Sequence, residues 1–165
     1  MSTKRGFAIL RIVFGIVWLI DAYFKWQPKF STDFISYVSG GLDGQPAWVQ
    51  GWIHFWLQII GVNPHFFALI IAILETLLAL GLIFGFLTRY AIFGGIILSL
   101  AIWSTAESFG GPYKAGSTDI GSAIIYVLVF VALLLGRSWE TFSLDGKIQK
   151  SFRRNTEKEI GRAHV

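Results

Sequence analysis

The chain has 165 residues, of which 54% are hydrophobic and only 15% are charged. Because a soluble domain carries about 25% charged residues, this composition argues against a disordered tail, a collagen and a nucleic-acid-binding domain, although the sequence pI is about 9.5. The absence of cysteine excludes disulfide exchange, thiol catalysis and iron–sulfur ligation on this chain. The composition predicts an integral membrane protein.

Four apolar stretches are long enough, or nearly so, to cross the roughly 30 Å core of a bilayer as helices of about 20 residues each. They cover residues 7–24, 66–87, 90–109 and 119–136. We therefore predict an all-α polytopic membrane protein whose residues 1–146 form a single domain, a four-transmembrane-helix bundle.

The first stretch carries charges that share one helix face, because Arg11, Asp21 and Lys25 are separated by near-multiples of the helical repeat. We expect the Arg11 side chain to snorkel to the nearby membrane surface. Asp21 lies at the other end of the stretch, where it is either hydrated or part of a site.

Glycines and prolines break residues 27–64 into short pieces, so this segment predicts a long loop that does not span the membrane. Within it, Trp48, Trp52 and Trp56 are spaced four residues apart, which places an aromatic stripe on an amphipathic helix. We expect this helix to lie along the membrane interface. The alternative is a lid over a hydrophobic ligand. No metal site is predicted, because His54 and His65 have too few potential ligands near them.

Glu75 lies about nine residues inside the second stretch, roughly 14 Å from its end and close to the bilayer midplane. A carboxyl group at that depth is either protonated or paired with a cation or a hydrogen-bond donor. Two interpretations remain open: an interhelical hydrogen bond that fixes packing, or a role in binding a ligand or handling a proton.

The third and fourth stretches are joined by a glycine-rich segment. Trp103 and Glu107 share a face near the end of the third stretch, and Asp119 falls in the first turn of the fourth, where a carboxylate favours the helix dipole. Tyr126 lies on the same face of the fourth stretch as Asp119.

The basic residues predict the orientation of the bundle. Four spans place both termini on one side of the membrane, together with the short turn at Arg89. That side holds eleven Lys and Arg residues. The opposite side holds only Lys25, Lys29 and Lys114. This asymmetry predicts cytoplasmic termini, with residues 147–159 as a basic cytoplasmic tail that contacts anionic headgroups. Residues 160–165 match one reading frame of a common sequencing adapter, and we expect them to be read-through.

This topology gathers most of the remaining polar side chains in the outer half of the bundle, with Glu75 as the floor of a candidate site. The residues are Asp21, Lys25, Glu75, Trp103, Glu107, Tyr113, Lys114, Asp119 and Tyr126.

Several blocks of the sequence resemble the DoxX/DoxD-like membrane proteins. They are Leu10-Arg-Ile12 with Gly15, the run from Phe24 to Pro28, Glu75 followed by Gly81, and the run from Phe109 to Tyr113 leading into Gly116-Ser-Thr-Asp-Ile-Gly121. The resemblance covers most of residues 5–140 and implies a four-helix bundle in a prokaryotic plasma membrane.

The DoxD resemblance implies a membrane subunit of a thiosulfate:quinone oxidoreductase-type system, with no covalently bound cofactor, a membrane quinone as electron acceptor and a second redox subunit as partner. In that interpretation Glu75, Glu107, Asp119 and Tyr126 are the catalytic candidates, because they can hydrogen-bond or protonate quinone carbonyls. Asp21, Lys25, Trp103, Tyr113 and Lys114 are the substrate-binding candidates. A non-enzymatic binding or transport protein for a small molecule, and a membrane scaffold for a partner, remain as alternatives.

Overall fold

The computed structural model describes residues 3–113 and 120–151, and within these ranges the chain is helical and contains no strand. The elements are α1 (Thr3–Lys25), α2 (Pro28–Thr32), α3 (Phe34–Ser39), η1 (Gly40–Leu42), α4 (Ala47–Gly61), α5 (Pro64–Phe84), α6 (Thr88–Ser104), η2 (Ser108–Gly110), α7 (Ser122–Leu135) and η3 (Ser138–Glu140).

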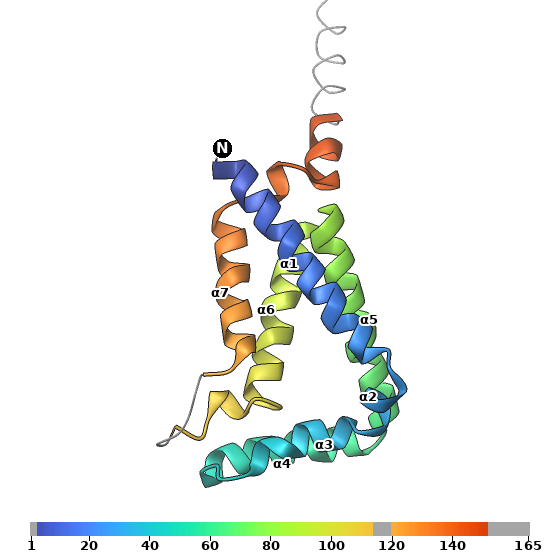
Figure 1. Ribbon diagram of the computed structural model, residues 1–165, viewed down its shortest axis with the longest axis vertical. Coiled ribbons are helices and arrows are strands. Elements are labelled where there is room, and N and C mark those ends of the chain that lie inside the picture. Colours follow the sequence, from blue (N-terminus) through green and yellow to red (C-terminus); the bar gives the residue numbers. More distant parts are fainter. Residues whose placement is uncertain (1–2, 114–119, 152–165) are drawn as a thin grey trace, which may run out of the picture.

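Two layers of helices make up the fold (Figure 1). Helices α1, α5, α6 and α7 extend along the long axis of the molecule, whereas α2, α3 and α4 run across one end of them. The N-terminus and the segment that follows α7 lie together at the other end. Residues 27–64, which we predicted to be a long loop containing one amphipathic helix, instead form α2, α3, η1 and α4 and lie across one end of the molecule.

Helices α1 and α5 are long and apolar enough to cross a membrane, and α6 and α7 are shorter apolar helices. Their bounds differ by a few residues from the predicted stretches. The largest difference concerns the third stretch, which we predicted to reach residue 109, because α6 ends at Ser104 and a turn follows it.

The outer faces of these four helices are apolar. Val13 on α1, Leu77 on α5, Ile97 on α6 and Leu128 on α7 are each more than half exposed. Large apolar side chains exposed along every helix of a layer indicate apolar surroundings rather than water.

Close helix packing depends on small residues. Helix α1 packs along α5, and α6 packs along α7. A Cβ atom at Gly15 would lie 2.9 Å from the Cβ of Leu82, so glycine allows α1 to approach α5 closely. On α6, the Phe130 ring of α7 occupies the space that a Cβ at Gly95 would need.

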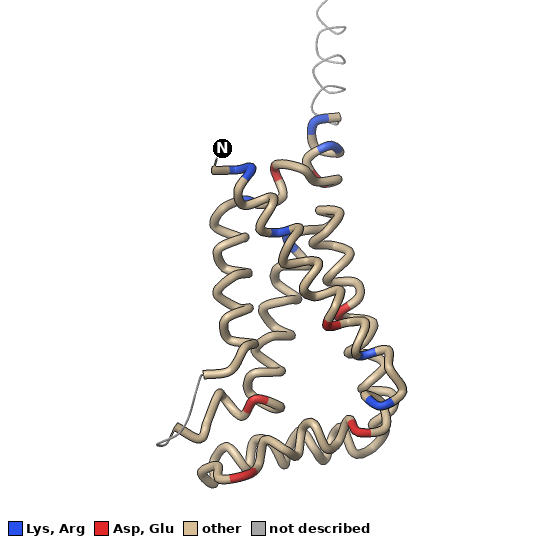
Figure 2. The backbone as a smooth tube through the Cα atoms, viewed as in Figure 1, with Lys and Arg blue, Asp and Glu red and all other residues tan. Residues whose placement is uncertain are grey.

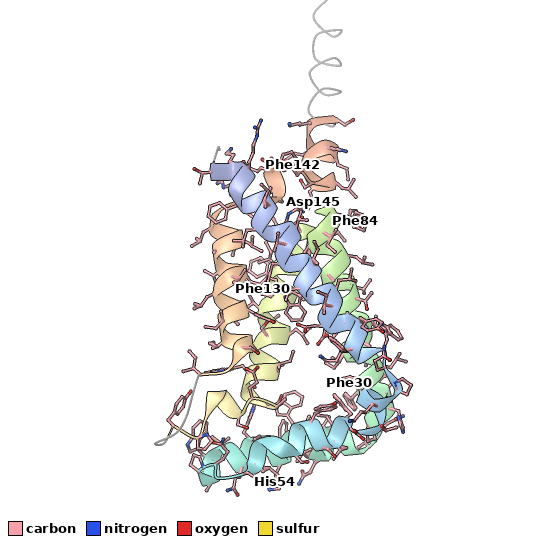
Figure 3. All side chains as sticks on the ribbon, in the orientation of Figure 1. Phe30, His54, Phe84, Phe130, Phe142 and Asp145 are labelled. Carbon is pink, nitrogen blue, oxygen red and sulfur yellow. The ribbon has the colours of Figure 1, made fainter. Side chains whose placement is uncertain are left out.

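An aromatic cluster fills the centre of the helix layer. The Phe130 ring centroid lies 4.9 Å from that of Phe14 and 5.9 Å from that of Trp18, and the Tyr126 ring packs on both of these α1 residues. Figure 3 shows Phe130 between α7 and the other long helices. Such edge-to-face contacts between α1 and α7 add to the burial of apolar area.

The end of the molecule that holds the N-terminus is closed by the segment after α7. We expected the Arg11 side chain to snorkel to the surface, but it is 0% exposed. Its Nη2 donates a hydrogen bond to the carbonyl oxygen of Phe142 at 2.6 Å. The Asp145 carboxylate accepts hydrogen bonds from the N–H groups of Leu87 and Thr88, and thereby caps α6. Figure 3 shows Phe142 and Asp145 beside α1 and near Phe84 at the end of α5.

A contact at the surface of the same end ties α1 to η3. The Lys4 ammonium donates to the Glu140 carboxylate at 2.6 Å, and this hydrogen bond lowers the pKa of Glu140.

Gly95→Ala is expected to lower the stability of the bundle by about 1–3 kcal/mol, because the added methyl group displaces the buried Phe130 ring. Gly94→Ala is the matched control, since a Cβ there meets nothing within 4 Å. The check is thermal unfolding of the two variants in one detergent. Equal midpoints would contradict the packing described here.

Candidate functional site

A cavity of about 530 Å³ lies between the ends of α1, α5 and α6 and the helices that run across them, α2, α3 and α4, which we call the crossing helices. Its walls are mostly apolar, with aromatic rings from α1 to α5 and aliphatic side chains from α5 and α6. The lining residues are Phe24, Lys25, Gln27, Lys29, Phe30, Phe34, Tyr37, Val38, Trp56, Ile60, Phe67, Ile70, Ile71, Glu75, Leu98, Ala101, Ile102, Thr105 and Ala106. Figure 3 shows Phe30 where the crossing helices meet α5. This volume and lining are typical of a site for a small organic ligand.

Glu75 and Lys25 form the charged part of the cavity. The Glu75 side chain is only 1% exposed, and its Oε2 lies 3.6 Å from the Nζ of Lys25, the last residue of α1. This separation exceeds the 2.7–2.9 Å of a direct charge-assisted hydrogen bond. No hydrogen-bond donor among the described residues reaches Oε2, and the Lys25 ammonium also lies 5.2 Å from the centroid of the Phe30 ring. Oε2 is therefore a buried acceptor that this part of the chain leaves unsatisfied.

A neighbouring hydrogen bond fixes the end of α1 against α5. The Trp26 indole N–H donates to Thr76 Oγ1 at 2.9 Å, and the Thr76 hydroxyl donates to the carbonyl oxygen of Ala72 at 2.7 Å. Because Trp26 follows Lys25 and Thr76 follows Glu75, this contact holds the two charges close together. Sequence reasoning missed both residues. The available signal was a lone threonine beside the buried glutamate and a tryptophan beside the lysine.

The crossing helices cover the cavity and are anchored from two sides. The buried face of α4, with Val49, Ile53 and Ile60, packs toward the interior of the molecule. The Ser108 hydroxyl donates to the carbonyl oxygen of Gly41 at 2.6 Å, where the absence of a side chain at Gly41 lets the two segments meet. The crossing layer is thus attached both to α5, through the chain, and to the segment after α6.

Asp21 and Tyr126 lie outside the lining of this cavity. Asp21, one turn before Lys25 on α1, is half-buried and interacts with both Lys25 and the Tyr126 hydroxyl. The Tyr126 ring belongs to the central aromatic cluster. The two residues therefore form a polar contact between α1 and α7, which interacts electrostatically with both Lys25 and Glu75 of the cavity.

Glu107 and Trp103 hold the start of α7. The Glu107 carboxylate accepts hydrogen bonds from the Ser122 hydroxyl at 2.6 Å and from the Ala123 N–H at 3.0 Å. The Trp103 indole N–H donates to the carbonyl oxygen of Ile120 at 2.8 Å. A carboxylate in this position satisfies free N–H groups of a helix and favours its dipole. Neither residue lines the cavity.

The remaining predicted residues are also apart from it. Tyr113 is 67% exposed, and its hydroxyl donates to the carbonyl oxygen of Phe109. Lys114 and Asp119 lie outside the described residues. Of the predicted site residues that the structure describes, Lys25 and Glu75 line the cavity. Trp56, from the helix considered above as an alternative lid over a hydrophobic ligand, also lines it, whereas sequence reasoning missed Phe30.

The helical fold, the apolar outer faces and the two helices long enough to span a bilayer define a membrane protein. The sequence model of the DoxX family matches residues 6–108, which is more than half of the chain. The chain therefore belongs to the DoxX family. Searches among curated proteins and among solved structures found no match. The matched segment runs from the first turn of α1 to beyond the end of α6, and so it includes every residue that lines the cavity.

Lys25→Met is expected to destabilise the protein by about 3 kcal/mol, because it leaves the buried Glu75 charge without its partner. We place the effect at the lower end of the range for buried pairs, since the Lys25 side chain is 25% exposed. Adding Glu75→Gln is expected to recover most of the loss. Thermal unfolding of the single and double variants checks this, and additive losses would contradict the pairing.

Proposed function

We propose that this DoxX-family protein is the membrane subunit of a DoxD-like redox system and binds a membrane quinone in the cavity lined by Glu75 and Lys25. The observation that carries the proposal is a cavity of about 530 Å³ with apolar and aromatic walls and one charged pair at its edge. A quinone head has the matching chemistry: a flat apolar ring that stacks on aromatic side chains, and carbonyl oxygens that accept hydrogen bonds from an ammonium group.

The electrons in this proposal come from a second subunit. The chain has no cysteine to carry thiol or iron–sulfur chemistry. Oxidation of a sulfur compound such as thiosulfate is therefore assigned to the partner, and the present chain holds the quinone that accepts the electrons. Lys25 orients a quinone carbonyl, and Glu75 is the nearest carboxylate for proton exchange with it.

We further propose that α1, α5, α6 and α7 all span the plasma membrane of a prokaryote, with α4 along the outer interface. Figure 2 shows basic residues near the N-terminus and in the segment after α7. At the opposite end, the described basic residues are Lys25 and Lys29. Such an asymmetry favours cytoplasmic termini. On α4, Trp48 and Phe55 are more than half exposed, as expected for an interfacial helix.

The absence of native cysteine allows a direct test of this topology. A cysteine at exposed Asp43 is expected to react with a membrane-impermeant maleimide added to intact cells, whereas a cysteine at exposed Ser151 is expected to react only after the cells are opened. Labelling of both positions in intact cells, or the reverse order, would rule out the proposed orientation.

Binding of a short-chain benzoquinone to the purified protein tests the site. Lys25→Met is expected to weaken binding about tenfold, because the lost hydrogen bond involves a charged donor. Ile102→Trp is expected to abolish binding by filling the cavity that Ile102 lines. Val131→Trp, on the exposed face of α7, is the matched control. Isothermal titration gives the affinities, and unchanged affinity in both Lys25→Met and Ile102→Trp would refute the site.

A further inference from the structure

The cavity has a hydrogen-bonding preference that follows from its buried carboxylate. In the part of the chain that the structure describes, Glu75 Oε2 has no donor within hydrogen-bond distance, although the side chain is almost completely buried. An unsatisfied buried acceptor costs about 1–3 kcal/mol, and more when it is charged. A ligand that brings a donor to this oxygen therefore binds better than one that brings only acceptors.

The two redox forms of a quinone differ in this respect. A quinone presents two carbonyl oxygens, which only accept hydrogen bonds, so a carbonyl placed beside an ionised carboxylate sets two acceptors against each other. A hydroquinone presents hydroxyl groups, each of which donates one hydrogen bond and accepts others.

The geometry of the pair suits a hydroxyl group. Oε2 is buried, so a ligand oxygen reaches it when the Glu75 side chain turns toward the cavity. If the 3.6 Å separation of Glu75 Oε2 and Lys25 Nζ is kept, that oxygen would lie about 2.8 Å from both of them. In that position a hydroxyl donates to the carboxylate and accepts from the ammonium at the same time. Trp56, which also lines the cavity, has a buried indole N–H that finds no acceptor among the described residues.

We propose that the cavity selects the reduced form of the quinone, with one hydroxyl bridging Glu75 and Lys25. This inference rests on the proposed function, since it assigns the preferred redox state of the same ligand at the same site. Hydrogen bonds to charged groups correspond to about a tenfold to hundredfold gain in affinity.

Preferential binding of the reduced form changes the driving force of the reaction. A tenfold preference raises the midpoint potential of a bound two-electron couple by about 30 mV. The bound quinone is then a better electron acceptor than the free one. The site thus makes reduction of the bound quinone more favourable, and it binds the hydroquinone product more tightly than the quinone substrate.

The test compares the two redox forms of one ligand on the full-length protein in detergent. A decyl-substituted benzoquinone and the corresponding hydroquinone are titrated separately under anaerobic conditions, and the ratio of their dissociation constants is measured. Glu75→Gln replaces the carboxylate by an amide that both donates and accepts, and it is expected to bring the ratio close to one. Glu140→Gln, the same change at the other end of the molecule, is the matched control and is expected to preserve the ratio.

The expected result is a hydroquinone affinity at least about tenfold higher than that of the quinone. Because the ratio is measured within each variant, a partial loss of folded protein affects both ligands equally. Equal affinities, or tighter binding of the quinone, would overturn the inference while leaving the proposed function intact. A preference that persists in Glu75→Gln would overturn the role of Glu75, and binding of neither form would overturn the proposed function itself.

Discussion

Polar groups on helices with apolar surroundings must be satisfied inside the protein, and this requirement organises the molecule at both ends. At one end, buried Arg11 donates to the carbonyl oxygen of Phe142, and Asp145 caps α6. At the other end, the Glu107 carboxylate accepts a hydrogen bond from the N–H of Ala123 in the first turn of α7. The Arg11 and Asp145 contacts join elements that are distant in sequence, whereas the Glu107 contact joins the segment after α6 to the next long helix. The apolar surfaces allow many relative positions of the helices, whereas these few directional contacts select one of them.

The cavity holds a second group that meets this requirement incompletely, after Arg11, whose Nε and Nη1 find no partner among the described residues. Glu75 has a charged partner, but the two groups are 3.6 Å apart, and the carboxylate lacks a hydrogen bond on Oε2. The position of the pair is nevertheless well defined, because the Trp26 to Thr76 hydrogen bond fixes the end of α1 on α5. A well-positioned, incompletely satisfied pair next to an apolar cavity favours the ligand binding proposed above, because less free energy of binding is lost in ordering the protein.

Much of the fold could be predicted from the sequence, because hydrophobic runs and aromatic spacing depend only on local periodicity. The helices near the predicted stretches and the helix that carries Trp48, Trp52 and Trp56 are of this kind. Which side chains meet across helices could not be predicted. Asp21 and Glu75 were grouped in one site, yet only Glu75 lines the cavity, because helix rotation and packing decide the partner of each face. Glu107 illustrates the same limit: its spacing from Trp103 indicated a shared face, and the turn after Ser104 that carries it to α7 left no periodic signal.

The hydrogen bond between Arg11 and Phe142 joins residues that are 131 positions apart in the chain. During synthesis, α1 enters the membrane long before its acceptor has been made, so the guanidinium group must stay near water or near the insertion machinery until α7 and the segment after it have emerged. The final position of α1 therefore depends on the segment that follows α7. A nascent chain that stops before Phe142 lacks the carbonyl oxygen that accepts the Arg11 hydrogen bond in the folded protein.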